Sequence, residues 1–171
     1  MFAAAQTAPA FDRHRRAMSA VLEPQSRQDN RHSAQDLPAP AVVFLVDDEE
    51  SVLRALSRML RASGFNVRAW SDPQEFLAEH DPDAPGCLVL DALMPGLTGL
   101  EVQQLLVSGG SERCIVFISG TTDTSICVDA MKAGAVTFLS KPVRMEAFVA
   151  AVREAMQIDG LGRETRRLRA S

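Results

Sequence analysis

The sequence predicts an α/β fold with a parallel β-sheet and helices on both faces. From Val42 onward, short apolar runs of four to six residues alternate with amphipathic stretches of ten to fifteen. The apolar runs are continuous, which is typical of strands that are covered on both faces. Five strand–helix units fit into the 117 residues from Val42 to Ile158. Alternating units of this kind form a parallel sheet through right-handed crossovers.

The five strands are predicted from their apolar runs. The first, Val42–Val46 (VVFLV), is predicted to be fully buried. The third ends directly at an aspartate, Asp91. The remaining strands are expected at Phe65–Ala69, Cys87–Leu90, Cys114–Ile118 and Val136–Leu139.

The first helix is predicted from Asp48 or Glu49 to Ser63, and Gly64 ends it in the left-handed position that follows many helices. Its apolar stripe has helical spacing and consists of Val52, Leu56, Met59 and Leu60. The second helix begins at Pro73, with Asp72 as its cap, and runs to about His80. The other helices are expected at about Gly99–Val107, Asp123–Ala133 and Arg144–Gln157.

Three segments are expected along the chain. Residues 1–41 are rich in Ala, Gln, Ser, Pro and Arg without periodicity, and we expect a disordered N-terminal extension. Residues 42–158 form the folded domain. Residues 159–171 are expected to be a short basic tail, too short for a helix-turn-helix output domain. The chain is therefore expected to carry no output domain.

The charge is distributed unevenly. Residues 42–158 carry nine basic and sixteen acidic side chains, a net charge of −7. An acidic domain argues against nucleic-acid binding by this chain and suits carboxylates gathered around a cation. The three cysteines lack metal-ligand spacing, and no apolar run is long enough to cross a membrane. We expect a cytoplasmic protein with reduced thiols.

The carboxyl ends of parallel strands meet along one rim, where such sheets bind ligands. The residues at the predicted strand ends are Asp47, Asp48, Asp91, Ser119 and Lys141. Two carboxylates about 4 Å apart repel by roughly 4 kcal/mol at an effective dielectric near 20. Three carboxylates at one rim therefore favour a divalent cation with oxygen ligands, such as Mg²⁺.

Each of these residues alone has a simpler explanation. An acidic pair before a helix usually compensates the helix dipole, and Glu49 and Glu50 are expected to do so here. A lone Asp after a strand is commonly a turn residue, and Phe138 could be an ordinary core aromatic. The interpretation depends on four strand ends delivering their side chains to the same rim.

Four segments give a resemblance to a known family: FLVDDEE, LVLDALMPGLTGLE, FISG and AMKAGAVTFLSKP. Together with the helix that follows, they resemble the receiver domain of two-component response regulators of the FixJ type. The resemblance covers about residues 42–158. It implies a flavodoxin-like sheet with strand order 2-1-3-4-5.

The resemblance also implies roles for residues. Asp91 would be the phosphoacceptor that becomes a 4-aspartylphosphate. Mg²⁺ would be held by Asp47, Asp48, Asp91 and the backbone carbonyl of Leu93.

Further roles follow from the same resemblance. Ser119, Lys141 and Phe138 would bind the phosphoryl group or respond to it, and the Lys141–Pro142 peptide bond would be cis. Leu93 and Thr121 would tune dephosphorylation. The stretch Gly120–Asp123 departs from the Gly-His-Gly-Asp associated with FixJ-type receivers.

The expected function is phosphorelay signalling, without enzymatic turnover. The phosphodonor would be a sensor histidine kinase. The helix 4–strand 5–helix 5 face would switch to regulate a downstream protein, and it could support a phosphorylation-dependent homodimer.

Two other classes of protein fit the sequence less well. An aspartate-nucleophile phosphatase of the haloacid-dehalogenase type needs a second Asp two residues after the first, where this chain has Leu93. A flavin-binding module needs a phosphate loop after the first strand, where Asp47 and Asp48 would repel a phosphate.

Overall fold

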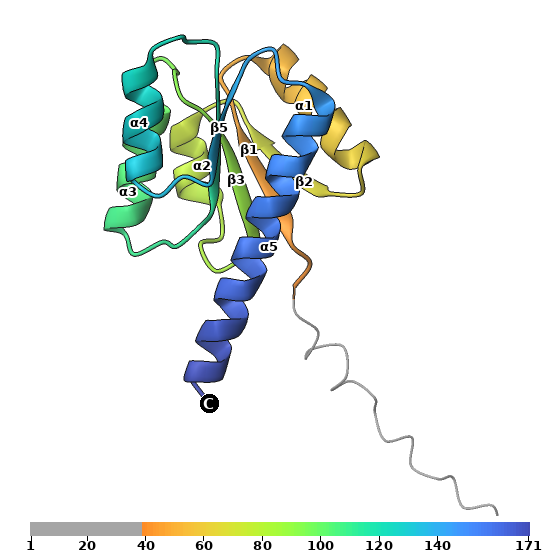
Figure 1. Ribbon diagram of the computed structural model, residues 1–171, viewed down its shortest axis with the longest axis vertical. Helices are drawn as coiled ribbons and strands as arrows, with labels where there is room; N and C mark the ends of the chain where they lie inside the picture. Colours follow the sequence, from red (N-terminus) through yellow and green to blue (C-terminus); the bar gives the residue numbers. More distant parts are fainter. Residues whose placement is uncertain (1–38) are drawn as a thin grey trace, which may run out of the picture. The chain divides into compact units, whose positions relative to one another are not determined.

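The computed structural model describes residues 39–171, which contain a five-stranded parallel sheet (Figure 1). The strand order is β2-β1-β3-β4-β5, as the resemblance implied. The strands are β1 (Val42–Val46), β2 (Asn66–Trp70), β3 (Gly86–Asp91), β4 (Ile115–Ser119) and β5 (Thr137–Ser140). The predicted strand positions are confirmed to within about one residue at each end.

Five helices connect and cover the strands. They are α1 (Glu50–Ala62), α2 (Pro73–Glu79), α3 (Gly99–Ser108), α4 (Thr124–Lys132) and α5 (Met145–Arg169). The predicted cap of α2 is confirmed, because the side chain of Asp72 accepts a hydrogen bond from the backbone N–H of Gln74 at 2.8 Å. Helix α3 begins with a reciprocal capping box between Thr98 and Glu101.

The core lies in two layers, one on each face of the sheet. On one face, α1 and α5 cover side chains such as Val43, Val89 and Val116. On the other face, α2, α3 and α4 cover Phe44, Leu88 and other residues of the alternating set. Because the central strands are buried on both sides, their apolar runs are continuous in the sequence.

Gly86 at the start of β3 is required by its surroundings. Its φ is +137°, and a Cβ atom there would lie 1.8 Å from the carbonyl oxygen of Val42. Only glycine fits a site where one backbone approaches another this closely. A side chain at this position would therefore push apart β1 and β3 at the point where Val42 and Gly86 pair.

The predicted end of the last helix near Gln157 is wrong. Helix α5 runs on to Arg169, through Gly160 and Gly162 and through most of the predicted basic tail. Each glycine lowers helix stability by about 1 kcal/mol relative to alanine, which is why the sequence favours an earlier end. Tertiary contacts of Asp159, Arg163 and Arg166 outweigh that cost.

None of the helices among residues 39–171 is long and apolar enough to span a bilayer. Residues 1–38, where a disordered extension was predicted, lie outside the described residues.

Candidate functional site

The strand register brings the chemical side chains to one rim. Strand β3 ends at Asp91, and β1 ends one residue before Asp47. Asp91 pairs with Ile118 of β4, so Ser119 lies one step beyond it. The backbone N–H of Lys141, just after β5, donates to the carbonyl of Ser119 at 2.8 Å. Four separate stretches of chain therefore converge.

Three carboxylates form a cluster at this rim. One carboxylate oxygen from each of Asp47, Asp48 and Asp91 lies within 4.8 Å of the others. Asp47 and Asp91 are buried, with exposed fractions of 0% and 3%, whereas Asp48 is exposed. The cluster is thus open to solvent on the side of Asp48.

Lys141 lies between two of these carboxylates. Its Nζ atom is 2.7 Å from Oδ2 of Asp47 and 3.2 Å from Oδ2 of Asp91. Partial burial works to lower the pKa of Lys141, but the contact with Asp47 and the charges of Asp91 and Asp47 outweigh burial and raise it. The ammonium group therefore stays protonated and screens the two acids from each other.

The surroundings of Asp91 disfavour its ionisation. Burial, and then the charge of Asp47, raise the pKa of Asp91 from 3.8 to about 6, against lowering contributions from the backbone N–H of Leu93 and from Lys141. The Leu93 N–H donates to Oδ1 of Asp91 at 3.2 Å. At pH 7 and above the carboxylate is mostly ionised and can act as a nucleophile.

The cluster suits a divalent metal ion. Asp47, Asp48 and Asp91 carry three negative charges against one ammonium, which leaves an excess of two. Oδ2 of Asp47 is buried and, within residues 39–171, accepts no hydrogen bond of regular geometry, although Lys141 is near it. Hard oxygen donors with excess negative charge are the ligands that Mg²⁺ prefers. The donor set therefore fits the cofactor expected from the sequence.

Ser119 and the loop after it are held by local hydrogen bonds. The Ser119 side chain is fully buried, and its Oγ accepts from the backbone N–H of Thr121 at 3.1 Å. Oγ1 of Thr121 accepts in turn from the N–H of Asp123 at 3.0 Å. Because a hydroxyl also carries one donor hydrogen, Ser119 can still donate a hydrogen bond.

The other predicted positions lie around this rim. Phe138 is partly buried and stacks on Phe117, with ring centroids 6.1 Å apart. The side chain of Leu93 is 47% exposed. The Lys141–Pro142 peptide bond is cis.

Glu49 lies nearer to the acidic cluster than its predicted role at the start of α1 implied. Glu49 is the residue before α1, but its side chain makes no capping hydrogen bond. Its carboxylate instead lies 3.9 Å from Nζ of Lys141. The approach depends on how β1 and β5 are placed, so the local sequence carries no signal for it.

A protein-family model matches most of the chain. The model for the response regulator receiver domain matches residues 43–153. Response regulator protein TodT of Pseudomonas putida is 42% identical over 118 residues, which are 69% of this chain and 52% of TodT. Nodulation protein W of Bradyrhizobium diazoefficiens is 42% identical over 127 residues, 74% of this chain and 56% of that protein. The chain spans about half the length of these curated relatives.

Solved structures are similar as well. Response regulator StyR aligns with a TM-score of 0.74 and 39% identity over 77% of this chain and 67% of StyR. FixJ-N aligns with a TM-score of 0.64 and 36% identity over 68% of this chain and 94% of FixJ-N.

Proposed function

Because the chain belongs to the response regulator receiver family, we propose that it accepts a phosphoryl group on Asp91 in a Mg²⁺-dependent reaction. Response regulators receive phosphoryl groups from sensor histidine kinases and act on downstream targets. The observation that carries the proposal is the position of Asp91. Its buried carboxylate lies beside Lys141 and within a cluster of three acids at the sheet rim.

Phosphoryl transfer requires mainly that the protein positions the reacting groups and stabilises their charge. A carboxylate oxygen of Asp91 forms a bond to phosphorus, and the phosphorus–nitrogen bond of the phosphohistidine donor breaks, so the imidazole leaves. Lys141 supplies positive charge beside the attacking group. Asp47, Asp48, Asp91 and the carbonyl of Leu93 would hold Mg²⁺, which neutralises phosphoryl oxygens when it is bound.

Signalling would then pass through Ser119 and Phe138. The hydroxyl of Ser119 can donate a hydrogen bond to a phosphoryl oxygen on Asp91, which draws the following loop inward. Phe138 can then move and reshape the α4–β5–α5 face that regulates a partner. Shifting the ratio of the switched to the unswitched conformation from 1:99 to 99:1 takes about 5.5 kcal/mol. One charge-assisted hydrogen bond supplies only about 1.5–3 kcal/mol. Lys141 and repacking of the loop therefore have to contribute.

We infer that the phosphodonor docks next to Lys141. An apolar pocket is lined by Val52, Leu56 and Met59 of α1 and by Pro142 and Val143 after β5. A helix of the kinase that carries the phosphohistidine could rest there while its ring reaches Asp91. The downstream protein would meet the α4–β5–α5 surface, and phosphorylation-dependent pairing through that surface belongs to the same proposal.

Mass spectrometry of the intact protein tests the assignment. The chain is incubated with acetyl phosphate and Mg²⁺, and we expect the mass of one phosphoryl group to be added. Asp91→Asn should add none, whereas Asp129→Asn, which changes an exposed acid of α4 outside the cluster, should behave like the wild type. Phosphorylation of Asp91→Asn at the wild-type level, or an EDTA-insensitive reaction, would rule the proposal out.

A further inference from the structure

The C-terminal part of α5 lies beyond the residues that the family model matches. We call residues Ile158–Arg169 the α5 extension, since the match ends at residue 153. The extension projects past the end of the sheet opposite the acidic cluster (Figure 1). Nothing in the proposed phosphoryl chemistry uses these residues.

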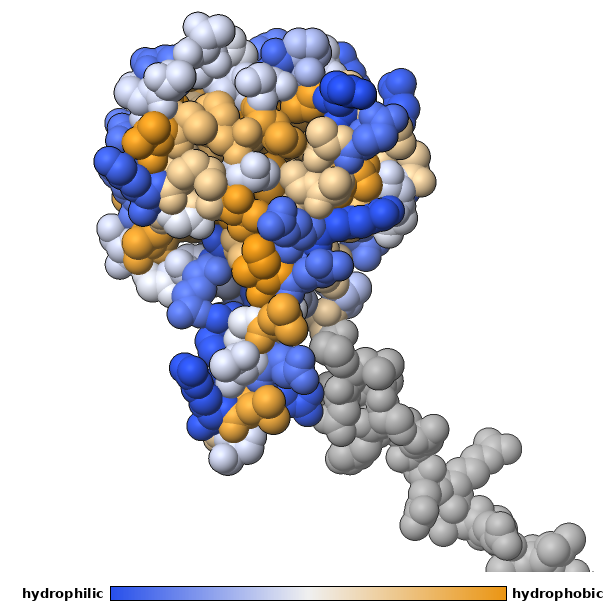
Figure 2. Space-filling view, in the orientation of Figure 1, coloured by the Kyte–Doolittle hydropathy of each residue, from blue (hydrophilic) through white to orange (hydrophobic). Residues whose placement is uncertain are grey.

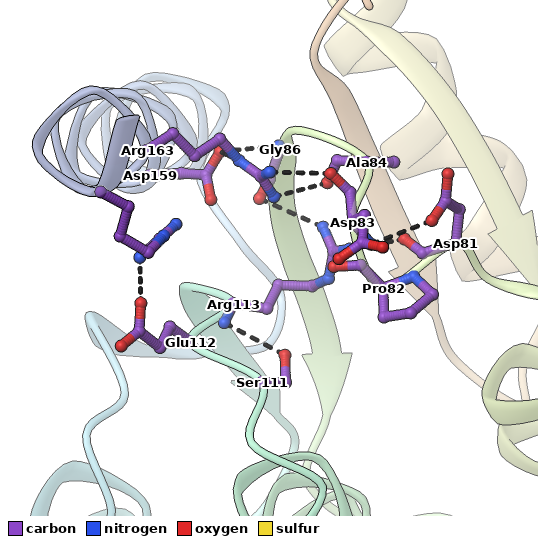
Figure 3. Close-up of polar contacts among 11 residues, drawn as sticks. Asp81, Pro82, Asp83, Ala84, Gly86, Ser111, Glu112, Arg113, Asp159 and Arg163 are labelled. Carbon is purple, nitrogen blue, oxygen red and sulfur yellow. Dashed lines mark hydrogen bonds and ion pairs between the residues drawn. The ribbon is translucent and has the colours of Figure 1, made fainter. Parts of the chain in front are cut away.

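One face of the extension is anchored to the domain (Figure 3). Oδ2 of Asp159 accepts hydrogen bonds from the backbone N–H of Gly86 at 2.9 Å and from Nε of Arg163 at 2.8 Å. Arg163 also donates to the carbonyls of Asp83 at 2.8 Å and Ala84 at 2.7 Å. Arg166 forms an ion pair with Glu112. Residues 159, 163 and 166 have helical spacing and share one side, so the helix cannot rotate freely.

The opposite face of the extension carries an apolar row. Ile158, Leu161 and Leu168 are 44%, 66% and 68% exposed. Thr165 lies between Leu161 and Leu168. The four positions 158, 161, 165 and 168 are therefore separated by three, four and three residues, which is the a/d spacing of a coiled coil. Figure 2 shows hydrophobic side chains following one another down the projecting part of α5. We call residues 158, 161, 165 and 168 the seam.

We propose that the seam pairs with the seam of a second copy of this chain in a short parallel coiled coil. In such a pair, each g position faces the e position five residues further along the partner helix. With Ile158 and Thr165 at a, Glu164 occupies g and Arg169 occupies e. Two-fold symmetry therefore brings Glu164 of each copy to Arg169 of the partner subunit, which gives two such pairs. The other flanking pair, Gln157 and Gly162, is neutral and does not oppose the contact.

The expected association is weak. The seam covers about three helical turns, and its contact area lies well below the roughly 1,200 Å² of a stable interface. The anchored face offsets part of this weakness, because a helix already held in shape loses less freedom when it binds. The pairing needs no phosphoryl group, so its test is independent of the proposed function.

Sedimentation equilibrium of the unphosphorylated chain over rising concentration tests the seam. We expect the average mass to rise from that of one copy toward that of two, at concentrations in the upper micromolar range or above. Leu161→Glu should remain a monomer throughout. Leu105→Glu, which alters a leucine of α3 that is 52% exposed and off the seam, should associate like the wild type. A wild type that stays monomeric, or equal association of Leu161→Glu, overturns the proposal.

Charge reversal tests the parallel register. Glu164→Arg and Arg169→Glu should each weaken association by several-fold because like charges then face each other, and the double variant should restore it. Antiparallel helices, or contact through α4, would give no such rescue.

Disulfide cross-linking tests the contact between the two seams at a single position. In a Cys127→Ser background, Leu168→Cys should form a disulfide dimer under oxidised glutathione, since Cys87 and the other remaining cysteine, Cys114, are buried. Arg167→Cys, outside the seam, should cross-link much less. Equal yields for the two variants contradict the parallel pair.

Discussion

At the scale of single residues, Asp91 is held in a setting that opposes its own charge. Burial and the neighbouring Asp47 raise its pKa to about 6, and Lys141 offsets only part of that effect. A carboxylate destabilised in this way gains from a nearby cation. The same setting therefore lowers stability without metal and favours binding of the Mg²⁺ that the proposed reaction uses.

In EDTA, Asp91→Asn should raise the free energy of unfolding at pH 7.5 by about 1–3 kcal/mol. A carboxyl group with a raised folded pKa contributes stability below the unfolded value of 3.8 and loses it as the pH rises through about 6. The gain from Asn should thus shrink as the pH falls from 6 toward 4. Urea unfolding at several pH values measures it, with the exposed Asp129→Asn as the control. A pH-independent difference would contradict this explanation.

The side chain of Leu93 is expected to affect the rate of dephosphorylation. It is 47% exposed two residues after Asp91, and an alkyl group offers water no hydrogen bond. Thr121, two residues after Ser119, lies at the other position expected to flank the hydrolytic water.

Leu93→Asn should speed dephosphorylation by about two- to tenfold, the rate equivalent of one hydrogen bond of about 0.5–1.5 kcal/mol. Decay of the phosphorylated protein, followed by mass spectrometry after removal of the donor, gives the rates. Leu105→Asn makes the same change on α3 and should leave the rate unchanged. Equal or slower decay in Leu93→Asn would refute the role of Leu93.

At the scale of elements, α5 joins the two ends of the domain. It begins shortly after Lys141 and Pro142 at the acidic rim, and it reaches the opposite end of the sheet at Asp159. Because Gly86 at the start of β3 donates to Asp159, the extension is tied to a central strand.

Asp159→Ala should lower the free energy of unfolding by about 1–3 kcal/mol, because the buried N–H of Gly86 and the guanidinium of Arg163 lose their shared acceptor. Hydrogen exchange of residues 158–169 should rise as well. Arg167→Ala, on the exposed side of the same helix, is the matched control. Unchanged exchange in Asp159→Ala would show that the helix does not depend on this anchor.

At the scale of the whole molecule, the proposed metal binding would be coupled to folding. The acids come from the ends of β1 and β3 and meet only in the folded state. A ligand that binds the folded state alone adds about 1.4 kcal/mol of stability at ten times its dissociation constant.

Mg²⁺ should therefore raise the melting temperature of the wild type, and EDTA should reverse the rise. Asp47→Asn should lose most of the shift because it removes one acid of the cluster, whereas Asp129→Asn should keep it. Differential scanning calorimetry over a Mg²⁺ titration measures the effect. An equal rise in Asp47→Asn would mean that the ion binds elsewhere.

Most of the fold and the members of the site could be predicted from the sequence. The runs VVFLV and LVL, the cap at Asp72 and the residues at the strand ends are local signals, because burial on two faces and capping act on neighbouring residues. Strand order was available only through the family resemblance. The sharing of Lys141 between Asp47 and Asp91, and the approach of Glu49, depend on how separate strands are placed.

The sequence by itself determined which side chains reach the rim, because a strand carries its last residue to the edge whatever surrounds it. Only the tertiary structure decided where α5 ends. The glycines at 160 and 162 predict an early end, and the hydrogen bond that overrides them joins Asp159 to Gly86, 73 residues away. Helix propensity is local and costs about 1 kcal/mol per glycine. A buried anchor is non-local, so its stabilising effect appears only once the chain has folded.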